Sequence, residues 1–170
     1  MQVIAIILLS IGAAILYGVT HDQVTARICV EYFTIGHPPI FPTTSPTLLA
    51  LGWGIIATWW VGLPLGIALA LAARAGKRPK VGARSLIRPI CILLLIMAFS
   101  ALLSGLIGAA LAERGSVWLQ EPFFSLVPKS AHVRFIADGW AHAASYVVGF
   151  VGGLVLACRV WVGRAAAVAT

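Results

Sequence analysis

Long apolar runs alternate with shorter polar segments along this chain of 170 residues. Four of these runs are almost free of charge and cover about residues 1–20, 47–73, 89–112 and 139–162. A helix needs roughly 20 residues to cross the hydrocarbon core of a bilayer, and each run meets that requirement. Because backbone amides in lipid must be paired within their own segment, we predict that each run is a membrane-spanning helix.

Composition supports the same prediction. Hydrophobic residues make up 61% of the chain and charged residues only 10%, and the mean hydropathy is +1.00. Soluble globular domains are usually about 45–50% apolar and about 25% charged. We therefore predict an all-α integral membrane protein in which residues 1–170 form a single domain with four transmembrane helices. The first run is expected to be a retained helix, because it lacks the basic start of a secretory signal peptide.

The basic residues predict the orientation. Segment 74–88, between the second and third runs, carries six Lys and Arg residues and no acid. Cytoplasmic loops are enriched in Lys and Arg, so we predict that this segment and both termini are cytoplasmic, in a bacterial-type inner or plasma membrane. Segments 21–46 and 113–138 then form a polar extracytoplasmic cap. Despite the net charge of +7, no aromatics are interleaved in the basic segment to stack on bases, so we predict lipid contacts and no nucleic-acid partner.

All four histidines and all five carboxylates lie within residues 20–45 and 113–142. Imidazole and carboxylate together are ligands for zinc, iron or copper. The predicted metal ligands are His21, Asp22, His37, Asp138 and His142. The two aspartates are either ligands or groups that orient the imidazoles. Glu31 is the candidate general base for a metal-bound water.

Helix geometry restricts which of these residues can meet. Asp138 and His142 are four residues apart and share a helix face. His21 and Asp22 end the first run at the same depth, so the two pairs could converge if the first and fourth helices are neighbours. His132 is ten residues before His142, about 15 Å along a continuous helix, and so could not bind the same ion.

Three other interpretations of the polar groups remain open at this stage. They could form an ordinary network of ion pairs and helix caps, or line a path for protons or ions. His21 and His142 could instead clasp a haem between two helices, although no sequence feature specifies the flat slot that a haem requires.

Small residues predict how the helices pack. Small residues recur every four positions in the third and fourth runs. They are Ser100, Ser104, Gly108 and Ala112 in the third run, and Ala141, Ser145, Gly149 and Gly153 in the fourth. Small residues at this spacing let helices approach closely in lipid, either within one chain or across a homodimer. In the second run, Pro64 is expected to kink the helix. After the first run, the helix is expected to continue from His21 to about Thr34, and a helix from Ala131 is expected to run directly into the fourth span.

Three functions are compatible with these observations. The first is a membrane-embedded metalloprotein, either a metal-binding protein alone or an enzyme that acts on a lipid or small apolar substrate at the outer face. The second is a non-catalytic accessory subunit that packs against a larger membrane complex. The third is an ion or proton transporter whose path uses Asp138, His142 and Tyr146, although transport sites usually lie nearer the bilayer midplane. A thiol oxidoreductase is excluded, because Cys29, Cys91 and Cys158 form no closely spaced pair.

Overall fold

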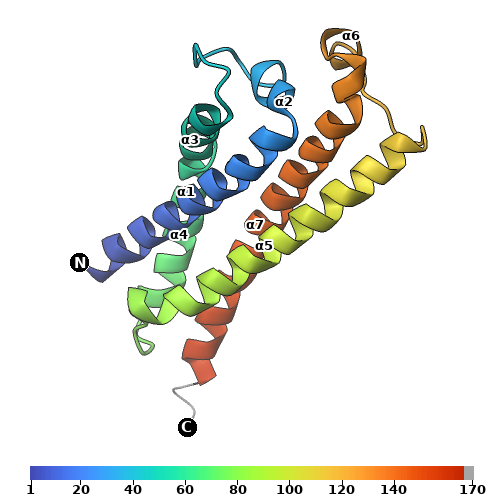
Figure 1. Cartoon of the computed structure of the whole chain (residues 1–170). Coiled ribbons are helices and arrows are strands. Elements are labelled where there is room, and N and C mark those ends of the chain that lie inside the picture. The colour runs from blue at the N-terminus through green and yellow to red at the C-terminus, as the bar shows by residue number, and fades with distance from the viewer. Residues whose placement is uncertain (167–170) are drawn as a thin grey trace.

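A computed structural model describes residues 1–166 of the chain. Within these residues all regular secondary structure is helical, and turns and loops connect the helices. Figure 1 shows the succession of helices. The elements in chain order are α1 (Gln2–Ile28), α2 (Val30–Thr34), α3 (Pro46–Ile56), α4 (Trp59–Arg74), α5 (Ala83–Glu113), α6 (Phe123–Leu126), the 3₁₀ helix η1 (Lys129–Ala131) and α7 (His132–Ala166).

Helical stretches of membrane length dominate the fold. Within the described residues, four are long and apolar enough to cross a bilayer, which confirms the all-helical prediction. They are Gln2–Ile28, Pro46–Arg74, Ala83–Glu113 and Lys129–Ala165. Their outward faces carry large apolar side chains, and Leu95, Phe99 and Val147 are each more than 60% exposed. So large an exposed apolar surface is characteristic of a protein solvated by lipid.

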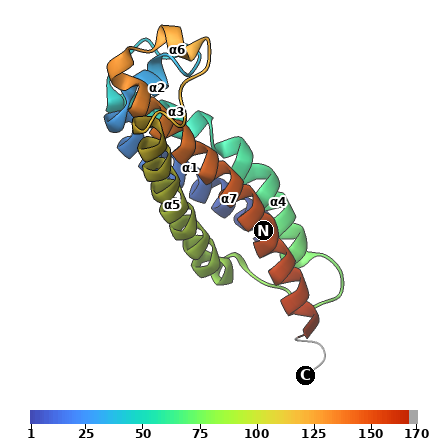
Figure 2. The same ribbon diagram turned by 90° about the vertical axis from the view of Figure 1, so that its right-hand side faces the viewer.

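The helices enclose a common interior. α1 packs against α3 and α4, α5 packs along α7, and contacts between α4 and α7 join the two pairs. Figures 1 and 2 show α2 and α6 together at one end, and the α4–α5 connection at the other end with the last turns of α7. The side-chain oxygen of Gln2 accepts a hydrogen bond from the amide of Ala83, at 3.1 Å, which places the amino terminus beside that connection.

The first polar segment is not one continuous helix. The helix is interrupted at Cys29, which has an extended backbone (φ −146°, ψ 93°), and the chain resumes as the short helix α2. Cys29 and Phe33 are 1% and 2% exposed, so the break lets apolar side chains turn into the protein. The prediction of a continuous helix as far as Thr34 was therefore wrong. By contrast, α7 starts at His132 and runs directly into the fourth crossing, as predicted.

The second crossing is interrupted at Ala57 and Thr58, between α3 and α4, whereas Pro64 lies inside α4. Side chains bind the backbone carbonyls at this break. The Thr58 hydroxyl donates to the carbonyl of Gly54 at 2.5 Å, and the Tyr146 hydroxyl donates to the carbonyl of Ala57 at 3.2 Å. An interruption within a bilayer requires such partners, because no lipid group can replace them.

α1 and α3 cross with their backbones in direct contact. A Cβ atom added to Gly18 would lie 2.6 Å from the carbonyl oxygen of Gly54, and one added to Gly54 would lie 2.5 Å from the amide nitrogen of Val19. Neither neighbour can move without moving its helix. The crossing therefore depends on two glycines, as small-residue packing in membranes often does.

Replacing Gly18 with alanine should lower the free energy of unfolding by about 1–3 kcal/mol, because α1 and α3 must separate to accept the methyl group. Gly12→Ala is the matched control, since a Cβ there meets nothing within 4 Å. Alanine is also the better helix former, so this variant should be at least as stable as the wild type. Unfolding in mixed micelles with increasing dodecyl sulfate measures the stability of both variants. Equal changes in the free energy of unfolding for Gly18→Ala and Gly12→Ala would contradict the proposed contact.

Small residues also bring α5 close to α7 within the chain. The Ser104 hydroxyl donates to the carbonyl of Trp140 at 3.0 Å, and a Cβ on Gly108 would lie 2.8 Å from the Trp140 ring. A Cβ on Gly105 would lie 3.4 Å from that of Ala141. These contacts account for Ser104, Gly105 and Gly108 by packing within one chain, and a homodimer stays a prediction.

At the opposite end from α2, the side chain of Arg164 closes the carboxyl end of α4. Its guanidinium is buried (the residue is 3% exposed) and donates to four backbone carbonyls. The acceptors are Ala72, Ala75 at 2.8 Å, Arg78 at 3.2 Å and Pro79 at 2.6 Å. Carbonyls at a helix end have no partners within the helix, so Arg164 supplies donors that α4 lacks.

Candidate metal centre

Three potential metal ligands from two helices meet near the α2 end of the protein. His21 and Asp22 lie on the last two turns of α1, and His142 lies on the third turn of α7. One ligand atom from each residue lies within 4.8 Å of the others. Asp22 and His142 are buried, with Asp22 Oδ1 3.2 Å from His142 Nε2. These residues are therefore close enough together to hold a metal ion.

The hydrogen bond on the far side of the His142 ring fixes its tautomer. His142 Nδ1 lies 2.8 Å from the backbone carbonyl oxygen of Asp138. A carbonyl oxygen only accepts hydrogen bonds, so Nδ1 carries the proton. In the neutral ring Nε2 then directs a lone pair at Asp22, and either a proton or a cation must lie between these two atoms. A histidine whose other nitrogen donates to a carbonyl is the usual arrangement of a metal-binding imidazole.

His21 has an unsatisfied nitrogen at the same place. Its Nε2 is buried and has no hydrogen-bond partner. The ring stacks on Tyr17, with centroids 5.6 Å apart, and contacts the ring of His142 edge to face at 4.6 Å. A buried polar atom without a partner is costly, and a metal bond would satisfy it. The contact between the two imidazoles leaves no slot for a haem between them.

The other predicted site residues lie outside this group of three. Asp138 is 1% exposed and its Oδ2 has no partner, while its backbone oxygen orients His142. His37 Nδ1 donates to the carbonyl of Tyr32 at 2.9 Å, and its ring lies on Trp53 with centroids 4.5 Å apart. Glu31 Oε2 accepts a hydrogen bond from Cys29 Sγ at 3.4 Å. Direct ligation by Asp138 or His37, and a catalytic role for Glu31, stay predictions.

Tyr32 and Tyr17 are neighbours of the cluster that sequence reasoning missed, and Tyr32 lies against His142. The Tyr32 ring centroid lies 4.6 Å from that of His142 and 5.2 Å from that of His37. The helix break at Cys29 places Tyr32 beside His142, and no sequence pattern predicts that break. Burial, helped by the negative charge of Asp138, raises the pKa of the Tyr32 phenol, so the group is a hydrogen-bond donor at neutral pH.

Burial also keeps two other groups of this segment neutral. It raises the pKa of the Cys29 thiol to about 12, so that the reactive thiolate is absent at neutral pH. It lowers the pKa of His37, although the hydrogen bond to the carbonyl of Tyr32 acts in the opposite direction. Of these neutral groups, Tyr32 and His37 line the same cavity as the cluster.

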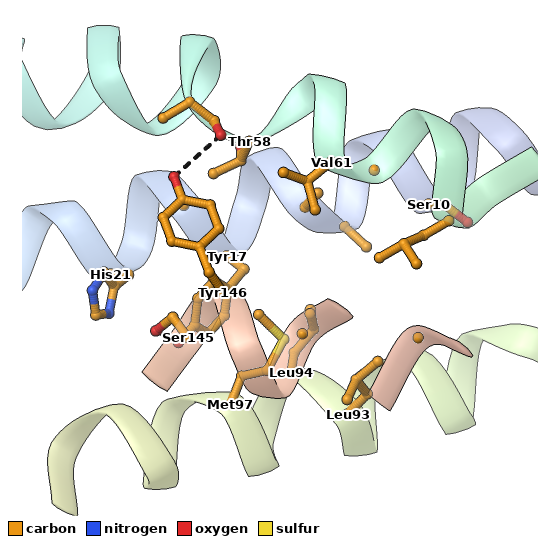
Figure 3. A pocket seen from close by; sticks show the side chains of 18 of the residues that line it. Ser10, Tyr17, His21, Thr58, Val61, Leu93, Leu94, Met97, Ser145 and Tyr146 are labelled. Carbon is orange, nitrogen blue, oxygen red and sulfur yellow. Dashed lines mark hydrogen bonds between the residues drawn. The ribbon is translucent and has the colours of Figure 1, made fainter. Parts of the chain in front are cut away.

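The cluster lies at one end of a long cavity between α1, α4, α5 and α7. About 150 Å³ of this space is open to the centres of water-sized molecules, and the cavity opens at its surface. In Figure 3, His21 lies at one end, and Ser10 and Leu93 lie toward the other. One helical turn below the cluster, the Tyr17 hydroxyl and Ser145 Oγ are hydrogen-bonded at 2.7 Å. Beyond them the lining is mostly apolar, with Ala14, Val61, Leu65, Leu94, Met97 and Leu156 among its side chains.

A scan against protein-family models gives no match, and searches of curated proteins and of solved structures give none either. The chemistry of the site is therefore derived from its residues. Two imidazoles and one carboxylate form a ligand set used by catalytic zinc sites, which keep a further position open for water or substrate.

Proposed function

We propose that this protein resides in a membrane and binds a divalent transition metal ion, zinc, iron or copper, through His21, Asp22 and His142. The observation that carries the proposal is the convergence of their ligand atoms within 4.8 Å from helices α1 and α7. The orientation of His142 by a backbone carbonyl and the unpartnered Nε2 of His21 support it independently.

Three protein ligands leave room for an oxygen ligand from water or a substrate. A metal in such a site can act as a Lewis acid or lower the pKa of a bound water to about 7. We further propose that the site acts on a lipid or small apolar substrate, because the cavity leading away from it is mostly apolar. The neutral Tyr32 phenol is placed to donate a hydrogen bond near His142, and Glu31 is the proposed general base.

Metal content tests the site directly. Protein purified in detergent without added chelator should carry close to one metal ion per chain by elemental analysis. His21→Ala and His142→Ala should each lose most of it, because each removes one of three ligands. His132→Ala is the matched control, since its Nε2 is engaged 2.9 Å from the carbonyl oxygen of Val127, outside the group. A well-folded wild-type protein without metal, or full metal content in both ligand variants, would exclude this site.

We also propose that the metal cluster faces the extracytoplasmic side and that both termini are cytoplasmic. Arg164 and the basic segment 74–88 lie at the end opposite α2 and α6 (Figure 1), while His142 contacts Tyr32 of α2 and His21 contacts His142. The excess of Lys and Arg on one side is the signal that sets orientation in inner membranes.

Thiol labelling of intact cells tests this orientation. An impermeant maleimide should modify Thr44→Cys without permeabilisation and Lys77→Cys only after it, because both positions are exposed and lie at opposite ends. The native Cys29 should stay unlabelled both before and after permeabilisation, because its thiol is buried and its pKa is raised. Labelling of both introduced cysteines from the outside would overturn the proposed topology.

The transport alternative is less well supported. Past Tyr146, the cavity offers mainly aliphatic side chains, which provide no ligands for an ion and no relay for a proton. The Tyr146 hydroxyl itself is engaged by the carbonyl of Ala57.

A further inference from the structure

The cavity has one polar end and a long apolar body, which is the polarity of a single-chain amphiphile. His21, Asp22 and His142 form the polar end, and Tyr17 and Ser145 follow one turn below. The remaining lining is mostly apolar and comes from α1, α4, α5 and α7 (Figure 3). An occupant is therefore expected to place a polar head at the metal cluster and an apolar tail along the bundle.

The depth of the cavity corresponds to one membrane leaflet. His21 and Ser10 are eleven residues apart on α1, and a rise of 1.5 Å per residue gives about 16 Å. His142 and Leu156 are fourteen residues apart on α7, which gives about 21 Å by the same rise. The hydrocarbon core of a bilayer is about 30 Å thick, so the apolar tail of one lipid occupies about half of it.

The cavity is also narrow. A Cβ atom on Gly149 would lie 2.8 Å from Cε of Met97, and one on Gly153 would lie 2.9 Å from Cδ1 of Leu65. Side chains of α4 and α5 thus reach the bare backbone of α7 along the lining. These side chains take up part of the space in front of α7, so we expect a slender chain to fit more readily than two chains side by side or a rigid ring system.

The charge of the cluster selects the head group. A divalent metal with one aspartate and two neutral imidazoles carries one net positive charge, which a single carboxylate balances. We propose that the protein binds a long-chain fatty acid, its carboxylate at the His21, Asp22 and His142 cluster and its chain extended toward Ser10 and Leu156. The head-group part of this proposal rests on the metal site proposed above; the chain part rests on the cavity alone.

Photo-crosslinking locates the chain. The probe is palmitate with a diazirine near the middle of its chain, added to delipidated wild-type protein in detergent, with crosslinked residues mapped by peptide mass spectrometry. The proposal expects crosslinks on Leu93, Leu94 or Met97, and at least a tenfold loss of them with excess unlabelled palmitate. Crosslinks confined to the outward-facing Leu95 and Phe99, which are 71% and 68% exposed, would show adventitious contact with the outer surface and overturn it.

A matched pair of variants tests whether the cavity itself is used. Leu94→Trp should fill the passage and abolish the interior crosslinks, whereas Leu95→Trp, on the lipid-facing side of the same helix, should retain them. Unchanged interior crosslinking in a folded Leu94→Trp protein would overturn the proposal. If Leu94→Trp does not fold, the crosslinks mapped on the wild-type protein decide whether the chain lies in the cavity.

Metal content measured on the same samples separates the two proposals. With metal bound, chelation should weaken interior crosslinking at least tenfold, because the carboxylate loses its partner. No effect of chelation would overturn the head-group assignment. Interior crosslinks in protein that never holds metal would overturn the metal site and support the position of the chain. Metal-loaded protein without interior crosslinks would support the metal site and overturn the position of the chain.

Discussion

Replacing Asp22 with asparagine is expected to weaken zinc binding at least about 100-fold, the upper range for groups that only orient ligands. Asp22 supplies the anionic oxygen of the ligand group, and asparagine keeps its shape while removing its charge. The buried metal would then retain both positive charges without a counter-charge from the protein. Competition between the protein and a chromophoric zinc chelator measures the change in affinity.

Asp138→Asn is the matched control for this prediction. Its carboxyl group is buried but lies outside the group within 4.8 Å, and its backbone carbonyl, which orients His142, is unchanged by the substitution. Zinc affinity should therefore fall less than about tenfold. A larger loss for Asp138→Asn than for Asp22→Asn would move the carboxylate ligand from α1 to α7.

Replacing Arg164 with methionine should lower the free energy of unfolding by about 3 kcal/mol, a large effect for one residue. Methionine keeps the apolar stem but leaves the carbonyls of Ala72, Ala75, Arg78 and Pro79 without their donors. Water can reach part of this helix end, which limits the loss. Unfolding by dodecyl sulfate in mixed micelles provides the measurement.

Two further variants make the Arg164 prediction specific. Arg159→Met removes an exposed cation from the same helix and should change stability by less than about 0.5 kcal/mol. Arg164→Lys should recover only part of the loss, because an ammonium group cannot reach several carbonyls as a planar guanidinium does. Equal stabilities of Arg159→Met and Arg164→Met would contradict the proposed cap.

The membrane-length helices were predictable because an apolar segment that crosses lipid must pair its backbone amides and carbonyls internally, as a helix does. The helix breaks were not. Pro64 drew attention in the second crossing, yet the interruption lies at Ala57 and Thr58, where Thr58 and Tyr146 satisfy the carbonyls. Tyr146 comes from another helix, so no local sequence window contains the reason for the break.

The convergence of the candidate metal ligands was partly predictable, because a bilayer also restricts their depth. His21 and Asp22 lie at the end of the first apolar run, and Asp138 and His142 lie at the start of the fourth, so a bilayer is expected to bring the two pairs to one level. Depth does not determine rotation about the helix axis. The structure turns His142 toward Asp22 and leaves the Asp138 carboxylate outside the group, an outcome that depends on how α7 packs against its neighbouring helices.

The contact between Asp22 and His142 joins residues that are 120 positions apart. A ribosome adds about 5–20 residues per second, so about 6–24 seconds pass between the synthesis of the two. Throughout this interval the Asp22 carboxylate lacks its contact with the imidazole of His142. The contact between Asp22 and His142 is therefore formed late in biogenesis, and a ribosome stalled before α7 would leave Asp22 without it.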